Sequence, residues 1–88
     1  MDLHLEIEEA LLLLCANVEL PARDNNTIRE FCEHREYGLA YEELCSAIGQ
    51  DNLSISVNDY ETIERIGRML EMNSHHWQDI KRLIRSPI

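Results

Sequence analysis

Glycine and proline are scarce in this sequence, with three and two copies in 88 residues. Sheet proteins with many tight turns need more of both, so the shortage favours a chain built from regular helices. The length suffices for one apolar core and argues against a deep substrate cavity. We therefore expect residues 1–88 to form a single all-α domain, a compact bundle of four to five short helices.

Basic residues are also in short supply. Eight of them stand against seventeen acids, which gives a formal net charge of −9. Such a surplus repels nucleic acid backbones and anionic lipid surfaces, and it attracts a basic partner. Residues 1–64 hold fifteen acids and three arginines (−12), whereas residues 65–88 hold two acids and five bases (+3). The acidic surface must therefore come mainly from the N-terminal two thirds.

Long hydrophobic runs and paired cysteines are missing. The apolar run ALLLLCA is too short for a membrane span, and acids precede it where a signal peptide carries bases. Cys15, Cys32 and Cys45 are odd in number, lie far apart and each sit among apolar residues. Buried free thiols in a reducing compartment explain this pattern. We expect a cytoplasmic protein.

The sequence offers no pattern for a metal, a cofactor or a catalytic group. Its cysteines and histidines form no Cys-x-x-Cys or His-x3-His pair, and the neighbours His75 and His76 would point to different sides of a helix. A calcium loop starting at Asp51 would place Leu53 and Ile55 where oxygen ligands are required. No glycine-rich phosphate loop is present. We predict a non-enzymatic protein without cofactor or metal.

Hydrophobic periodicity predicts the helices. Apolar residues recur at steps of three and four, which places them on one face of each helix. The five expected stripes are Leu3, Ile7, Leu11, Leu14 and Val18; Ile28, Phe31 and Cys32; Ala40, Leu44, Ala47 and Ile48 with Tyr41 and Cys45 beside them; Val57, Tyr60, Ile63, Ile66 and Leu70; and Trp77, Ile80, Leu83 and Ile84.

The breaks between the first three helices follow from turn-forming residues. Pro21 should end the first helix, and Asn25 or Asn26 can cap the second by accepting a backbone N–H. Gly38 adopts left-handed geometry without steric cost, so we expect a corner or kink there. The third helix should stop at Gly49.

The second half of the chain has weaker signals. Residues 53–57 alternate like a strand, but no partner strand is evident, so we interpret them as an extended connector. Ser56, with Asp59 three residues later, resembles a capping arrangement for the fourth helix. Gly67 should let a neighbouring helix approach closely. Ser74 should cap the fifth helix.

One spacing suggests a different function. Cys45, Gly49 and Ile55 match the small-x3-Gly-x5-apolar pattern of a helix-turn-helix, in which small residues let two helices pack across a tight turn. Its second helix, however, would present acids from Asp59 onward before its first base, Arg65. A DNA-binding helix-turn-helix protein therefore stays an alternative, as does a generic helical adaptor that self-associates.

Two stretches, EFCEHREYGLAYEELCSAI and LSISVNDYETIERIGRMLEM, carry a family resemblance. The run Glu36-Tyr37-Gly38-Leu39-Ala40 leads into Leu44, and an apolar helix with Ile63, Gly67 and Met69 follows after a linker. This part of the chain, about residues 28–72, resembles the Maf-type small immunity proteins of bacterial polymorphic toxin systems. The resemblance implies a non-enzymatic, cytoplasmic helical antidote that binds the toxic domain of a cognate secreted effector.

The candidate partner-binding residues are acids grouped around two tyrosines. Carboxylates attract the lysines and arginines of a basic toxin. If that toxin is a nuclease, the carboxylates would also mimic the phosphates of its substrate. Tyrosines are the usual anchors of such contacts. Aspartates beside the connector join them, because exposed loops often carry recognition. The eight residues are Glu33, Glu36, Tyr37, Tyr41, Glu42, Glu43, Asp51 and Asp59.

Each of these residues also has a plainer interpretation. The glutamates form a solvated helix face in that interpretation, and Tyr37 is a core residue with its hydroxyl at the surface. For Tyr60 and Trp77 we expect packing in the core. The expected partner is a protein toxin with a basic surface, not nucleic acid or membrane, and the chain itself is a monomer or a weak homodimer.

Overall fold

A chain of short helices makes up the structure, a computed structural model that describes residues 3–85. The elements are α1 (Leu3–Val18), α2 (Ala22–Glu33), α3 (Tyr37–Gln50), α4 (Val57–Met69), α5 (His75–Gln78) and the 3₁₀ helix η1 (Lys81–Leu83). The expected all-α bundle is confirmed. Within the described residues, none of these helices combines the length and the apolar character that crossing a membrane requires.

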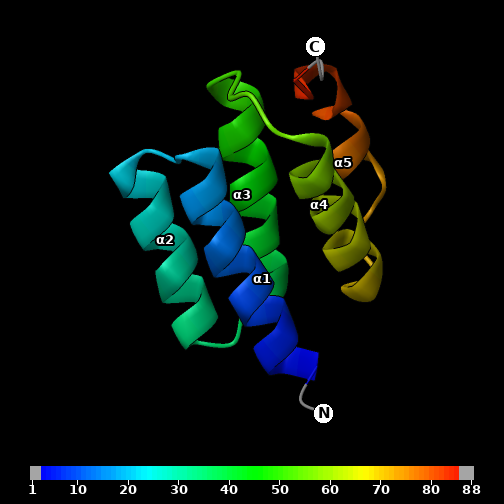
Figure 1. Ribbon diagram of the computed structural model, residues 1–88. Coiled ribbons are helices and arrows are strands. Elements are labelled where there is room, and N and C mark those ends of the chain that lie inside the picture. Colours follow the sequence, from blue (N-terminus) through cyan, green and yellow to red (C-terminus); the bar gives the residue numbers. More distant parts are fainter. Residues whose placement is uncertain (1–2, 86–88) are drawn as a thin grey trace.

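Helix α3 is the central element. It packs against α2, α1 and α5, while α4 packs against α1 and α5 (Figure 1). Ala40, Leu44 and Ile48 on its inner side are fully buried, as the stripe predicted. Helix α2 runs antiparallel to α3 and α5 lies on its other side, so only one narrow face of α3 reaches the solvent.

Four helices end in a residue with left-handed backbone, and none of the four is glycine. Each of these residues has a φ between 50° and 58°, whereas no glycine within residues 3–85 has a positive φ. A side chain in this conformation costs roughly 1–2 kcal/mol relative to ordinary backbone, so tertiary packing must hold these turns. The residues are Glu19, Arg35, Asn52 and Glu71.

The corner expected at Gly38 is one of these turns, and its predicted position was wrong. Arg35 makes the turn, while Gly38 lies in the first turn of α3. The amide of Glu36 donates to the carbonyl of Phe31 at 2.9 Å, and the amide of Arg35 donates to that of Cys32 at 3.0 Å. These two bonds satisfy the last carbonyls of α2 and so fix the corner at Arg35, three residues before Gly38.

The start of α2 also differs from the expectation. Its first turn follows Pro21 directly, and the amide of Asn25 donates to the carbonyl of Pro21 at 3.0 Å. Asn25 and Asn26 therefore lie inside the helix and do not cap it. Pro21 is the N-cap residue, with φ −54° and ψ 147°, and no side chain makes a capping bond there. For α4 the predicted cap is confirmed: Ser56 Oγ accepts from the amide of Asp59 at 3.0 Å.

The fifth helix is shorter than its apolar stripe predicted. After one turn of α5 the chain becomes η1 and then extends, so that Ile84 forms a single parallel bridge with Ile55. The amide of Ile55 donates to Leu83 at 3.1 Å, and the amide of Arg85 donates to Ile55 at 2.8 Å. The connector does have a backbone partner, which sequence periodicity could not reveal.

Two further expectations near these helices were wrong. Val57 was placed inside, but it is 46% exposed because it occupies the first position of α4. Ser74 was the expected cap of α5, yet its side chain accepts no capping bond. Instead Asn73 Oδ1 accepts from the amide of His75 at 3.0 Å.

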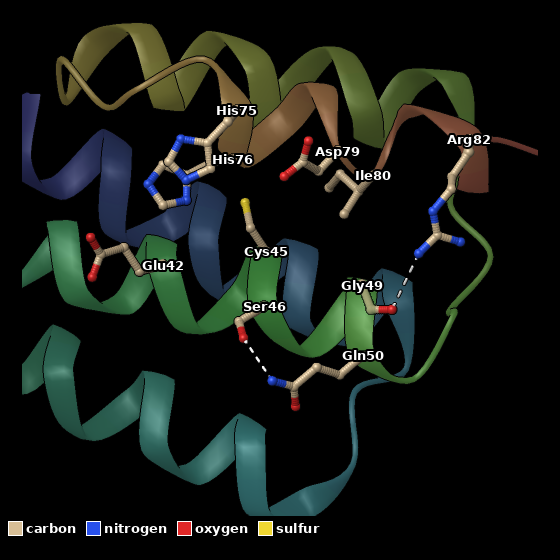
Figure 2. Close-up of a pocket in the computed structure, with 10 residues that line it drawn as sticks. All are labelled: Glu42, Cys45, Ser46, Gly49, Gln50, His75, His76, Asp79, Ile80 and Arg82. Carbon is tan, nitrogen blue, oxygen red and sulfur yellow. Dashed lines mark hydrogen bonds between the residues drawn. The ribbon is translucent and has the colours of Figure 1, made fainter.

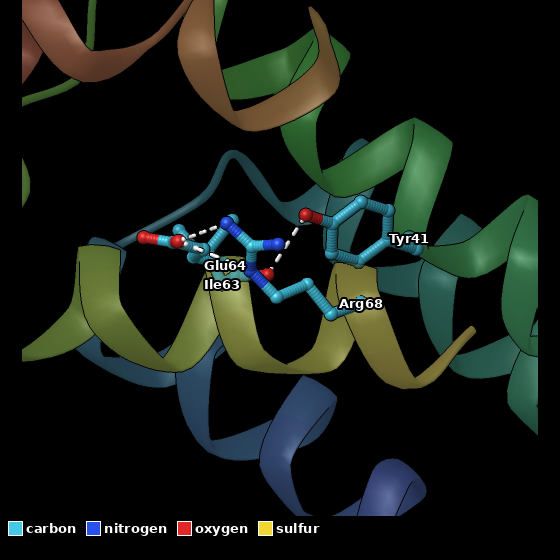
Figure 3. A network of polar contacts seen from close by, with 4 residues as sticks. All are labelled: Tyr41, Ile63, Glu64 and Arg68. Atoms are coloured by element: carbon cyan, nitrogen blue, oxygen red, sulfur yellow. Dashed lines mark hydrogen bonds and ion pairs between the residues drawn. The ribbon is translucent and has the colours of Figure 1, made fainter. Parts of the chain in front are cut away.

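Close packing in the core joins α3, α4 and α5. Tyr41 is fully buried, and its hydroxyl donates to the carbonyl of Ile63 at 2.8 Å (Figure 3). A Cβ built on Gly67 would lie 2.6 Å from two carbons of the Trp77 ring and would also meet the Tyr41 hydroxyl. The role expected of Gly67, to allow close approach, is confirmed. Tyr60 and Trp77 are buried as predicted.

Candidate partner-binding surface along helix α3

The solvent face of α3 forms a ridge with a groove on each side. Ser46 and Gln50 make the ridge, and Gln50 Nε2 donates to Ser46 Oγ at 3.3 Å (Figure 2). Both residues line both grooves. We name the hollows the α3–α5 groove and the α2–α3 groove. Together with the ridge they form one continuous surface.

The α3–α5 groove has a volume of about 480 Å³. Glu42 stands at one end near the two histidine rings, Asp79 projects from α5, and Cys45 rises from the floor between them (Figure 2). The remaining wall belongs to the C-terminal segment. Its lining residues are Glu42, Cys45, Ser46, Gly49, Gln50, His75, His76, Asp79, Ile80 and Arg82.

The α2–α3 groove is of similar size, about 470 Å³, and it is more polar. It lies between the start of α2 and the second half of α3. Here the ridge faces a helix whose first turn carries both an acid and a base. The lining residues are Pro21, Arg23, Asp24, Glu43, Ser46, Ala47, Gln50 and Asp51.

Carboxylates dominate this double-groove surface. The two grooves hold five acids (Asp24, Glu42, Glu43, Asp51, Asp79) and two arginines (Arg23, Arg82), a balance of −3. A smaller hollow beside the N-terminal end of α1 holds Glu8 and Glu33 against Arg35, a balance of −1. The hollow on α4 holds two glutamates and two arginines and balances to zero. Taken singly, the α2–α3 groove balances to −2 and the α3–α5 groove to −1, so the excess of acids is greatest in the α2–α3 groove.

Ion pairs neutralise acids elsewhere but not in the grooves. Arg65 binds Glu6 at 3.1 Å, and Arg68 binds Glu64 at 2.7 Å on the outer side of α4 (Figure 3). Within residues 3–85, no salt bridge involves a carboxylate of either groove. The negative charge of the double-groove surface thus faces solvent, where a partner's cations can meet it.

Three of the eight residues selected from the sequence meet on this surface. Glu42 lines one groove, and Glu43 and Asp51 line the other. Glu33 and Glu36 are exposed but lie at the opposite end of α3, beside the corner after α2. A helix of this length spans about 21 Å, so Glu36 and Asp51 are far apart. The structure does not bring the eight residues into one patch.

The aromatic anchors proposed from the sequence are not on the surface. Tyr41 was expected to contact a partner, but it is fully buried and its hydroxyl is bound to α4. Tyr37 is 7% exposed and its ring lies against that of His4, with 5.6 Å between centroids. Asp59 is 6% exposed and accepts from Asn17 Nδ2 at 3.2 Å, so it joins α1 to α4 instead of bordering an open loop.

Sequence reasoning missed several groove residues. Asp24 and Asp79 carry part of the charge, but no periodicity links either of them to the glutamates of α3. His75 and His76 were expected on different sides of a helix, whereas their ring centroids lie 4.1 Å apart, with the ring planes tilted by 35°. They begin a helix of four residues, so the spacing rule of a long helix does not apply.

Burial adjusts the protonation of two groove residues. The pKa of Glu43 is raised, first by loss of water and then by a hydrogen bond and repulsion from Asp24. Burial raises the pKa of the Cys45 thiol to about 12, so this thiol is neutral at pH 7. Cys15 and Cys32 are likewise buried and free, with pKa values raised to about 11 chiefly by burial. The predicted buried free thiols are confirmed.

Arg82 lies at the end of the α3–α5 groove. Its guanidinium binds the C-terminal end of α3. It donates to Asn52 Oδ1 at 2.9 Å and, at 3.5 Å, to the carbonyl of Gly49 (Figure 2). A guanidinium therefore already occupies one end of this groove.

The chemistry of the double-groove surface is that of cation binding. Among the described residues, no three His, Cys, Asp or Glu side chains are placed to hold one metal ion.

Searches against protein-family models, curated proteins and solved structures find no match to the chain. The geometry of the grooves is thus the main basis for a functional hypothesis.

Proposed function

We propose that this chain is a non-enzymatic, cytoplasmic antidote that binds a basic toxic protein domain through the double-groove surface. The observation that carries the proposal is the excess of five carboxylates over two guanidinium groups in the two grooves that flank the ridge of α3. A basic protein is attracted to such a surface over a distance of about 10 Å at ordinary salt.

The family resemblance supports the choice of a toxin as partner. The run Glu36-Tyr37-Gly38-Leu39-Ala40 that resembles Maf-type immunity proteins forms the N-cap and the first turn of α3, the helix that carries the ridge. The resemblance and the acidic surface therefore involve the same helix. Inhibition then consists of occluding the basic groove of the toxin, with carboxylates in place of substrate phosphates.

Measurement of the association rate tests the acidic surface. We expect the gene of the partner, a secreted protein with a toxic domain, to lie beside the gene of this chain, and co-expression of the chain should protect cells from that domain. The association rate should fall steeply as salt is raised, because exposed charges steer the encounter. Glu42→Lys combined with Asp79→Lys should lower the rate at low salt by about tenfold or more.

A matched control separates the surface from the net charge. Glu9→Lys combined with Glu61→Lys makes the same change in charge at exposed acids of α1 and α4, outside both grooves. The control should retain most of the association rate. Equal losses in both double variants, or an association rate insensitive to salt, would reject the double-groove surface. Absence of protection in cells would reject the antidote function.

A further inference from the structure

Helix α1 is apolar on its outer side as well as on its inner side. Residues 11–14 are four leucines in a row, and successive side chains of a helix point about 100° apart, so the four cannot all face one core. Leu11 and Leu14 are buried, whereas Leu13 is 62% exposed. Leu5, about two turns earlier, is 50% exposed. A helix that is apolar all round is normally covered on every side.

Helix α4 lies beside α1 (Figure 1). The two helices run in opposite directions, because Arg65 binds Glu6 near one end of the contact and Asn17 donates to Asp59 near the other. The salt bridge between Arg65 and Glu6 is itself exposed, so the outer sides of α1 and α4 form one continuous surface. We name this surface the α1–α4 face.

The charges that α4 contributes to this face are self-complementary. Two glutamates precede two arginines, so the sign of the charge changes at the middle of the helix; the residues are Glu61, Glu64, Arg65 and Arg68. A second α4 that runs in the opposite direction brings Glu61 opposite Arg68. Glu61 forms no salt bridge within residues 3–85. Arg68 holds Glu64 through Nε and Nη2, which leaves Nη1 as a further donor (Figure 3).

We propose that two copies of this chain form a dimer through the α1–α4 face, with the helices of one copy antiparallel to those of the other. A two-fold axis relates the copies, so every contact occurs twice. Glu61 of each copy then binds Arg68 of the other. Charge complementarity selects this occupant, because α4 matches its own reversed order of charges, whereas a uniformly acidic face would select a basic partner.

The same axis pairs the exposed leucines. Leu5 and Leu13 are each four residues from Glu9, so a two-fold axis at Glu9 brings Leu5 of one copy against Leu13 of the other. The salt bridge of Glu6 with Arg65 holds this part of α1 beside the middle of α4, so one axis serves both helices. The two Glu9 carboxylates meet near the axis. Each has an arginine bound about one helical turn away, at Glu6, which offsets the repulsion.

The size of the face predicts a weak, reversible dimer. The shorter of the two helices has 13 residues, so the face is about 20 Å long and about 20 Å wide, roughly 400 Å² for each copy. This area is at the low end for specific interfaces. Leu13, Glu61 and Arg68 line neither groove. Dimer formation should therefore leave the association rate with the toxic domain unchanged, and the inference does not depend on the proposed function.

Light scattering on the whole protein measures the association. The average mass should rise from that of one chain, 10.3 kDa, toward twice that value as the concentration increases from about 10 μM to about 1 mM. Leu13→Glu should weaken the association about tenfold or more, because each dimer contains the substitution twice. Leu39→Glu is the matched control and should retain the association, because Leu39 is 45% exposed but belongs to the first turn of α3.

Charge reversal tests the register of the two copies. Glu61→Arg or Arg68→Glu alone sets like charges opposite each other twice in every dimer, so each variant should associate about fivefold more weakly. An equimolar mixture of the two variants contains dimers in which both pairs are attractive again. The mixture should therefore associate at close to the native strength. Both residues are exposed, and circular dichroism verifies that each variant is folded.

Three results would each overturn the dimer: the mass of one chain at about 1 mM, equal losses in Leu13→Glu and Leu39→Glu, or a mixture no stronger than its two components. The mass of one chain, together with weaker binding of the toxic domain to Leu13→Glu, would assign the α1–α4 face to the toxin instead. A chain that dimerises as described but gives cells no protection would refute the antidote function alone.

Discussion

The inner and outer sides of α3 are built on opposite principles. On the inner side, Tyr41 is fully buried and lies against Gly67 with no space left for a methyl group. On the outer side, Ser46 and Gln50 separate two open grooves lined by acids. The inner side specifies the fold, and the outer side is free to specify a partner. Substitutions on the two sides should therefore be separable by experiment.

The largest effect is expected on the inner side. Gly67→Ala adds a methyl group that would lie 2.6 Å from the Trp77 ring, so the ring or the helix must move. Overpacking of this kind costs about 1–3 kcal/mol in the free energy of unfolding, which urea denaturation measures. Gly38→Ala is the control, because its Cβ would meet only Met72 Sδ, at 3.9 Å. Equal stability of Gly67→Ala and the native chain would refute the close packing.

An outer substitution should change binding and leave stability intact. Ser46→Trp places a large ring on the ridge and blocks both grooves, because Ser46 lines each of them. We expect at least a tenfold loss of affinity for the toxic domain, about 1.4 kcal/mol. The free energy of unfolding should change by less than about 0.5 kcal/mol, as is usual for exposed sites. Unchanged affinity, measured by calorimetry, would exclude the ridge from the interface.

Removal of the Tyr41 hydroxyl is a second test of the inner side, with a smaller expected effect on stability. Tyr41→Phe keeps the ring and removes the donor to the carbonyl of Ile63. This carbonyl lies inside α4, whose own ladder of hydrogen bonds uses it, so it does not become unpaired. The loss should be about 1 kcal/mol in the free energy of unfolding. Binding to the toxic domain should not change. A binding defect in this variant would indicate that Tyr41 does contact the partner.

The smallest effect concerns Glu43 and depends on pH. Its raised pKa means that the folded chain holds this proton to higher pH than the unfolded chain does. Because burial and then the neighbouring Asp24 disfavour the charged carboxylate, protonation of Glu43 stabilises the fold fully below the ordinary pKa of a glutamate, about 4.3, and this contribution is lost as the pH rises through the raised value.

The corresponding test is a comparison of unfolding curves. Glu43→Gln keeps a donor for Asp24 and has no proton to lose. It should match the native chain near pH 4 and exceed it by a few tenths of a kcal/mol at pH 7, since the group is partly exposed. Urea unfolding between about pH 4 and pH 8 measures this difference. Parallel stability profiles for the two proteins would contradict the raised pKa of Glu43.

The fold was predictable where periodicity is long. Ile7, Leu11 and Leu14 follow a helical stripe over several turns, and all are buried. The errors occur where a few tertiary contacts outweigh local preference. Arg35 takes the left-handed position that favours glycine, and Ile84 leaves its helical stripe to pair with Ile55. Neither contact leaves a mark in the neighbouring sequence.

The candidate surface was predictable only in part, for a related reason. The excess of acids pointed to α3, and Glu42 and Glu43 do lie on its solvent side. Tyrosine is a common anchor residue at interfaces, but Tyr41 lies about 100° round the helix from Glu42, so its side chain points into the core. Folding alone brings Asp24 and Asp79 to the same surface as these glutamates, so the sequence does not reveal their contribution.

The single bridge between Ile55 and Ile84 has a consequence for local opening of the structure. Trp77 anchors the start of the wall that α5 contributes, and the bridge fastens the chain that follows it to the connector. Opening of the wall must therefore release the connector as well. Amide hydrogens of Ile55 and Arg85 should exchange with deuterium at matched rates, as one cooperative unit, and a ligand held in the α3–α5 groove should slow both.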